Sequence, residues 1–257
     1  MAMRMRPRRI MATDHVGSGD LIRTLGLLWS DDEAAVKPGP KPKLTQEKVV
    51  TAGITVADRD GLEGLTMRAV AEELGISTMA LYRYVPGKGE LLDLMLERLN
   101  GPVGEPAWGP GEWRNAMESM AEGMWRLYLD HPWFLQVNQA RPLLGPRSLE
   151  GLDIILRAFD ELGISDVEKV GMLTAVSHYV GGLARETILQ QQAATQSGVT
   201  DEEFWSAQEP YLAKAFSDGR FPHVAALDPH CWETPPIESM RFGLEAMLDG
   251  FEQRFRT

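Results

Sequence analysis

The sequence predicts an all-α protein with a small and a larger helical domain. From Thr45 onward, apolar residues recur three and four positions apart, which is the period of amphipathic helices. Gly and Pro separate these segments, and no segment shows the alternation of a half-buried strand. A break at 101–110, rich in Pro and Gly, divides the helices into two groups. We expect an N-terminal extension over 1–43, a small domain over 44–100 and a larger one over 101–257.

The extension itself reads as three pieces. It begins with a basic stretch over 1–9 and ends with a basic Pro/Gly linker over 37–43, which cannot be helical. Between them, Leu21, Leu25 and Leu28 share one face of a short helix that we expect to pack on the body of the protein.

Four short helices are expected in the small domain. The first runs from the Thr45 cap to about Asp58, and the second from the Thr66 cap to Gly75. The third begins at the Ser77 cap and ends at Val85, because proline disfavours helix in the residue before it. The fourth begins at Gly87. In the larger domain we expect helices over 111–130, 133–139, 147–163, 166–192, 201–217 and 236–255, with a mobile polar loop over 190–198.

Charge and composition restrict the class of protein. The net charge of −11 is concentrated in residues 101–257, which carry 12 basic and 23 acidic side chains, whereas residues 1–43 carry 8 basic and 5 acidic ones. A single cysteine, Cys231, cannot form an intramolecular disulfide or a cysteine-based metal site. The chain contains no membrane-spanning or signal segment, so we expect a cytoplasmic protein without metal or cofactor.

The most informative stretch is Gly64 to Leu92. It encodes two short capped helices joined by a tight turn at Gly75-Ile76, which is the pattern of a helix-turn-helix. The second helix, Thr78 to Tyr84, displays hydroxyl, thioether, phenol and guanidinium groups and fits a DNA major groove. Lys88 opens the next helix, where free backbone N–H groups favour a phosphate. The alternative is an ordinary three-helix cluster whose aromatic pair belongs to the core.

This stretch resembles the DNA-binding signature of the TetR family of bacterial regulators, through its Gly-Leu-Thr, Leu-Gly, Leu-Tyr and Lys-…-Leu-Leu elements. The resemblance implies an operator-binding homodimer that reads a pseudo-palindrome. It also implies base contacts from Arg68, Thr78, Met79, Arg83 and Tyr84, and phosphate contacts from Thr66, Tyr82 and Lys88.

The larger domain resembles, more weakly, that of the tetracycline-repressor branch of the family. The similar residues are Trp113, His131, Arg141-Pro142, Ser177-His178-Tyr179, Glu186 and Phe242-Gly243-Leu244-Glu245. That branch holds drug-bound magnesium with a histidine just before its Arg-Pro pair, whereas this chain has Asn138-Gln-Ala there, and the drug-anchoring asparagine falls on Met120. The resemblance therefore implies a different ligand, bound without metal.

We expect a hydrophobic effector to bind in a pocket of this domain. Its candidate lining residues are Met120, Met124, Trp125, Trp133, Phe134, Asn138, His178 and Glu186. The alternatives are that the methionine and aromatic stripe is core, and that His178 is a core or interface residue. Small residues on the helices near 167–190 and 237–255 suit a four-helix bundle between two subunits, the alternative being burial within one subunit.

No catalytic signature is present in the sequence, which contains no GxSxG, HExxH, Walker loop, dinucleotide fingerprint or SxxK. We therefore expect a ligand-responsive transcriptional repressor and no enzyme. The competing interpretation is an architectural or protein-interaction regulator with the same helix-turn-helix and no small-molecule effector.

Overall fold

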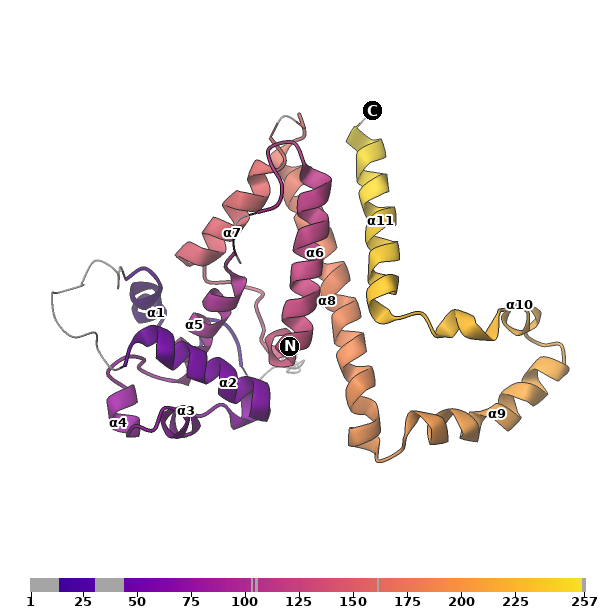
Figure 1. Cartoon of the computed structure of the whole chain (residues 1–257), viewed down its shortest axis with the longest axis horizontal. Helices are drawn as coiled ribbons and strands as arrows, with labels where there is room; N and C mark the ends of the chain where they lie inside the picture. Colours follow the sequence, from indigo (N-terminus) through magenta and orange to yellow (C-terminus); the bar gives the residue numbers. More distant parts are fainter. Residues whose placement is uncertain (1–13, 31–43, 103, 105, 161, 256–257) are drawn as a thin grey trace, which may run out of the picture. The chain divides into compact units, whose positions relative to one another are not determined.

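The computed structural model describes residues 14–30, 44–102, 104, 106–160 and 162–255, and this part of the chain is all-α, as predicted (Figure 1). The α-helices are α1 (Leu21–Leu28), α2 (Gln46–Gly64), α3 (Met67–Glu73), α4 (Thr78–Leu81), α5 (Lys88–Asn100), α6 (Trp113–Asp130), α7 (Pro146–Arg157), α8 (Asp166–Ser197), α9 (Asp201–Ser217), α10 (Pro222–Ala225) and α11 (Pro236–Phe255). Two 3₁₀ helices, η1 (Pro132–Gln136) and η2 (Pro229–Trp232), complete the set.

The described residues form two compact units. Unit 1 contains those up to Ala116 together with 130–160, and unit 2 contains 117–129 and 162–255. The long helix α6 passes from one unit to the other. Both η1 and α7, which follow the break at 101–110, pack with the N-terminal helices in unit 1.

The core of unit 1 lies between α2, α3 and α5. Val49, Val56, Val70 and Met95 are fully buried there, and each belongs to the apolar stripe of its helix. The stripe of α2 ends at Gly61, whose φ of 71° interrupts the helix where the sequence predicted a stop.

A buried carboxylate attaches α7 to α5. Glu97 of α5 accepts hydrogen bonds from the backbone N–H groups of Arg147 and Ser148 at 2.7 and 3.1 Å, and also from the Ser148 hydroxyl. These N–H groups lie in the first turn of α7, where no earlier carbonyl can accept from them. Glu97 therefore caps a helix whose bonded residue Arg147 lies 50 residues further along the chain.

Unit 2 is built around α8 and α11, which pack side by side (Figure 1). Val176, Val180, Leu244 and Leu248 are buried between them and their neighbours. The Tyr179 hydroxyl donates to the carbonyls of Ser239 and Met240 at 3.0 and 3.2 Å. Gly243 permits this approach, since a Cβ there would overlap the Tyr179 ring.

Three predictions about the helices of the larger domain are wrong. The expected mobile loop over 190–198 is helical, because its Gln and Ala residues favour helix and no breaker occurs until Gly198, which ends α8 with φ 71°. The expected helix over 133–139 is the short 3₁₀ helix η1. The helix α7 ends at Arg157 rather than near 163. The sequence analysis also missed α10 and η2, which are each only four residues long.

Both α9 and α10 leave large apolar side chains exposed. Neither helix has a buried residue in the described chain. The large apolar residues exposed on α9, on α10 and next to α10 are Phe204, Trp205, Tyr211, Leu212, Phe216, Phe221, Val224 and Leu227. An apolar helix face of this kind is normally stable only when something covers it.

The helices of the described residues differ in length and hydropathy from membrane spans. None of them is both long and apolar enough to span a bilayer.

Candidate nucleic-acid interface

A glycine-dependent turn joins the two helices of the helix-turn-helix. Gly75 has a φ of 66°, the Ile76 N–H donates to the Ala71 carbonyl, and the Gly75 N–H donates to the Glu72 carbonyl. This pair of bonds is a Schellman motif, which ends α3 and turns the chain sharply. Ser77 then caps α4 by accepting from the Ala80 N–H at 3.3 Å.

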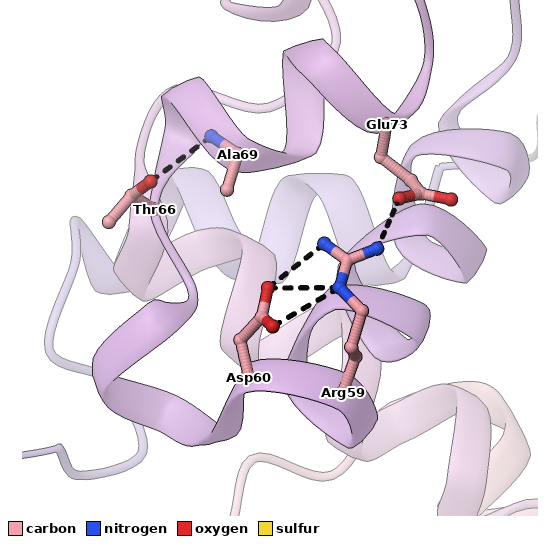
Figure 2. A network of polar contacts seen from close by, with 5 residues as sticks. All are labelled: Arg59, Asp60, Thr66, Ala69 and Glu73. Atoms are coloured by element: carbon pink, nitrogen blue, oxygen red, sulfur yellow. Dashed lines mark hydrogen bonds and ion pairs between the residues drawn. The ribbon is translucent and has the colours of Figure 1, made fainter.

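A cluster of exposed ion pairs fastens α3 to the end of α2 (Figure 2). The Arg59 guanidinium donates to Asp60 at 2.9 Å and, across the gap between helices, to Glu73 at 2.8 Å. Arg59 lowers the pKa of the Asp60 carboxyl by hydrogen bonding and charge attraction. Figure 2 also shows Thr66, whose hydroxyl accepts from the Ala69 N–H at 3.1 Å and caps α3.

The segment from Thr78 to Val85 presents an apolar and a polar side. Leu81 and Val85 are fully buried against unit 1, whereas Met79 is 76% exposed. Tyr82 and Arg83 are also exposed, and Tyr84 is half-buried. The helix proper ends at Leu81, four residues earlier than predicted. The turn nevertheless continues, because the N–H groups of Arg83 and Tyr84 bond carbonyls three residues back.

The other predicted DNA contacts include Arg68 on α3, Thr78 on α4 and Lys88 on α5. The Arg68 side chain is 84% exposed and pairs with Glu72 at 2.8 Å on its own helix. Thr78 is half-buried at the start of α4. Lys88 is the first residue of α5, and its ammonium donates to the Leu62 carbonyl at 2.9 Å and to Asp14 at 3.3 Å. All eight predicted DNA-contacting residues therefore lie in unit 1, on or beside three consecutive helices.

The eight predicted effector residues are divided between the two units. Unit 2 contains five of them. Three lie on α6, namely Met120, Met124 and the buried Trp125, and two are exposed on α8, namely His178 and Glu186. The other three, Trp133, Phe134 and Asn138, belong to unit 1. Trp133 and Phe134 are buried there, and Asn138 bonds the N-terminal segment.

Sequence reasoning missed the role of Asp58. This carboxylate oxygen accepts from the Trp133 indole N–H and bonds the His131 ring, both at 2.7 Å. It thereby ties the end of α2 to η1, at the point where the chain returns from α6. No local sequence pattern could reveal these two contacts, because His131 and Trp133 lie 73 and 75 residues after Asp58.

Within the described residues, no group of three or more His, Cys, Asp or Glu side chains is placed to hold a metal ion. The row of acids on α5 instead binds backbone N–H groups. Glu90 accepts from Asp20, Asp93 accepts from Gly17, and Glu97 caps α7 as described above.

Two family comparisons cover most of the chain. Residues 49–95 match the family described as bacterial regulatory proteins, tetR family, and residues 105–255 match the tetracyclin repressor-like, C-terminal domain. The chain is 49% identical over 245 residues to the HTH-type transcriptional repressor DrrR1 of Streptomyces coeruleorubidus, which covers 95% of this chain and 90% of that protein. It is 32% identical to an HTH-type transcriptional regulator of Saccharopolyspora erythraea, over 77% of this chain and 82% of that one.

Among solved structures, apo ActR from Streptomyces coelicolor superposes with a TM-score of 0.63 at 26% identity, covering 82% of this chain and 96% of ActR. ActR in complex with actinorhodin superposes with a TM-score of 0.61 at 26% identity, covering 83% and 99%.

Proposed function

Because the chain belongs to the TetR family of DNA-binding transcriptional regulators, we propose that it is a homodimeric repressor that a small molecule releases from a pseudo-palindromic operator. The observation that carries the proposal is the side of the helix-turn-helix that unit 1 leaves uncovered. Met79, Tyr82 and Arg83 are exposed on it, while Leu81 and Val85 fix the segment from behind.

The roles of the residues follow from their chemistry and position. Base edges in the major groove are contacted by five side chains, those of Arg68, Thr78, Met79, Arg83 and Tyr84. Tyr82, Thr66 and Lys88 contact phosphates, which position the protein without specifying sequence. In this role the protein acts in the cytoplasm and has no catalytic site.

The dimer forms through α8 and α11. Val167, Val170 and Phe242 are 82%, 57% and 79% exposed on these helices, and Gly182 and Ala246 are exposed beside them. A second subunit covers this apolar surface in a four-helix bundle, which places two recognition segments about one DNA turn apart.

The effector binds in unit 2, along α6, and is largely hydrophobic. Met120, Met124 and Trp125 supply an adaptable apolar surface, and Glu186 in an acidic domain favours a positive group on the molecule. The similarity to ActR, which has been solved with actinorhodin, supports a small-molecule effector. His178, on α8 of the same unit, completes the proposed set.

Release follows from a shift of α6. This helix continues into η1, and η1 is bonded through Trp133 and His131 to Asp58 on α2. An effector that moves α6 therefore changes the position of α2 and of the recognition segment, so that the loaded dimer no longer fits both half-sites. DNA and effector must then weaken each other's binding reciprocally.

In vitro selection from a random duplex pool, followed by gel shifts, tests DNA recognition. We expect Lys88→Ala to weaken binding to all sequences and to reduce the salt slope by about one unit per subunit, and Arg83→Ala to relax base preference at one position. Arg241→Ala is the matched control, because Arg241 is an exposed arginine paired with Glu122 in unit 2. Normal affinity and base preference in both test variants would refute the assignment.

A thermal-shift screen of small molecules, followed by operator release, tests the effector site. We expect hydrophobic compounds that bind without metal to release DNA and magnesium–tetracycline to be a poor inducer. Release by micromolar magnesium–tetracycline that depends on Asn138 or His178 would contradict the metal-free site. A screen without any releasing compound would favour a regulator that has no effector.

A further inference from the structure

An N-terminal segment that lies before both matched family domains is built into unit 1. We call residues 14–20 the strap. Its backbone pairs with the residue after Val137: the Val16 N–H donates to the Asn138 carbonyl, and the Asn138 N–H donates to the Asp14 carbonyl, both at 3.2 Å. The pairing fixes the strap in register, since these bonds form a short parallel bridge.

The other side of the strap lies against α5. The Gly17 N–H donates to Asp93 at 3.0 Å and the Asp20 N–H donates to Glu90 at 3.0 Å. The approach is close enough to require glycine, because a Cβ at Gly89 would lie 2.7 Å from the Gly19 nitrogen. The following helix α1 packs on α5 with Leu28 buried, so the strap is held at both ends.

This arrangement places the Asp14 carboxylate beside Lys88. The Lys88 ammonium lies 3.3 Å from the Asp14 oxygen, and the two side chains are 34% and 25% exposed. A carboxylate oxygen and a phosphate oxygen are both anionic acceptors, so they use the same donors of an ammonium group. The second partner of Lys88, the Leu62 carbonyl, is neutral and keeps the side chain in place.

We propose that Asp14 is an internal competitor of the operator phosphate for Lys88, so that the strap sets operator affinity below the value that the helix-turn-helix alone would reach. The inference rests on the proposed function, because it requires Lys88 to contact a phosphate. When DNA binds, Lys88 exchanges Asp14 for a phosphate oxygen, and the released carboxylate takes up a cation. That uptake offsets part of the counterion release that drives binding.

Asp14→Asn in the full-length protein tests the proposal with the selected operator duplex at several salt concentrations. We expect binding about 3- to 10-fold tighter at low salt and a salt slope steeper by about one unit per subunit. The matched control is Glu47→Gln, which removes the same charge from an exposed carboxylate paired with Arg98 in unit 1. Equal tightening in both variants, or weaker binding by Asp14→Asn, would overturn the proposal.

Two further variants separate the possible failures. In a Lys88→Ala background, Asp14→Asn should change affinity less than twofold, and a persistent gain would overturn the competition. If Lys88→Ala loses affinity but Asp14→Asn has no effect, only the proposed competition by Asp14 is refuted. If Lys88→Ala binds with normal affinity, the phosphate contact of Lys88 itself is refuted. Val16→Pro keeps every charge but removes the N–H bond to Asn138, so it should also tighten binding if the strap holds Asp14 in place. Unchanged affinity in Val16→Pro would argue against the proposal that the strap holds Asp14 at Lys88.

Discussion

The Asp93 carboxyl gives unit 1 a stability that falls as the pH rises. The pKa of this carboxyl is raised from 3.8 to about 6, chiefly by burial; the Gly17 N–H bond and His15 lower this pKa, and the neighbouring Glu90 carboxylate raises it. The folded protein therefore holds a proton on Asp93 more tightly than the unfolded chain does. The contribution of the Asp93 carboxyl to the free energy of unfolding is therefore fully present below about pH 4 and is lost as the pH rises to about 6.

The perturbation that tests this is Asp93→Asn, which cannot ionise but keeps an oxygen to accept from Gly17. A shift of about two pKa units corresponds to at most about 3 kcal/mol, and partial solvent screening reduces the expected effect to about 1–2 kcal/mol. We expect the variant to unfold about 2–8 °C higher than the unmodified protein at pH 7.5 and within about 2 °C of it at pH 4.

The assay is thermal unfolding between pH 4 and 8 at a fixed protein concentration, because the melting temperature of a dimer depends on concentration. Asp153→Asn, at an exposed position on α7, controls for the loss of one negative charge. An Asp93→Asn variant that is less stable at pH 7.5, or that keeps the pH dependence of the unmodified protein, would refute the reasoning.

Three further predictions concern the turn, the dimer and the link to η1. Gly75→Ala forces a side chain into positive φ, so it should lower the free energy of unfolding by about 1–2 kcal/mol and weaken DNA binding. The control Gly123→Ala, within α6, should leave the free energy of unfolding unchanged or raise it. Equal free energies of unfolding for the two variants would contradict this prediction. Gly182→Glu or Ala246→Glu should produce a monomer in sedimentation, and an unmodified protein that is monomeric at micromolar concentration would exclude the proposed dimer. Asp58→Ala leaves the buried Trp133 indole N–H without its acceptor and should cost about 1–3 kcal/mol in urea unfolding, against a much smaller loss for Asp60→Ala.

The elements governed by local rules could be predicted from the sequence. The caps Thr45, Thr66 and Ser77 begin helices as expected, and Gly75 ends α3, because each of these signals acts within a few residues. The short helix at Leu21 is present for the same reason. The end of α8 was misplaced because a polar sequence was taken as a loop, although Gln and Ala favour helix when no breaker intervenes.

The contacts that define the site could be predicted only in part. The exposure of Met79 and Arg83 follows from the period of a helix whose other face is apolar. By contrast, the carboxylate partner of Lys88 and the partners that hydrogen-bond to Asp58 and Asp93 lie 73 to 76 residues away in the sequence, and no spacing rule connects residues at that distance. The same holds for the proposed effector residues, whose assignment to different units depends on the path of η1.

The fold also explains how a segment with more acidic than basic residues can serve as a DNA-binding unit. Glu90, Asp93 and Glu97 are buried on α5, where each carboxylate accepts backbone N–H groups whose dipoles offset part of its charge. Several of the remaining acids form ion pairs within unit 1, and Asp60 and Glu73 share Arg59. A count of charges along the sequence therefore overstates the repulsion that a phosphate meets at the helix-turn-helix. Asp14 acts differently, because the strap places its carboxylate directly on Lys88, the lysine that such a phosphate would use.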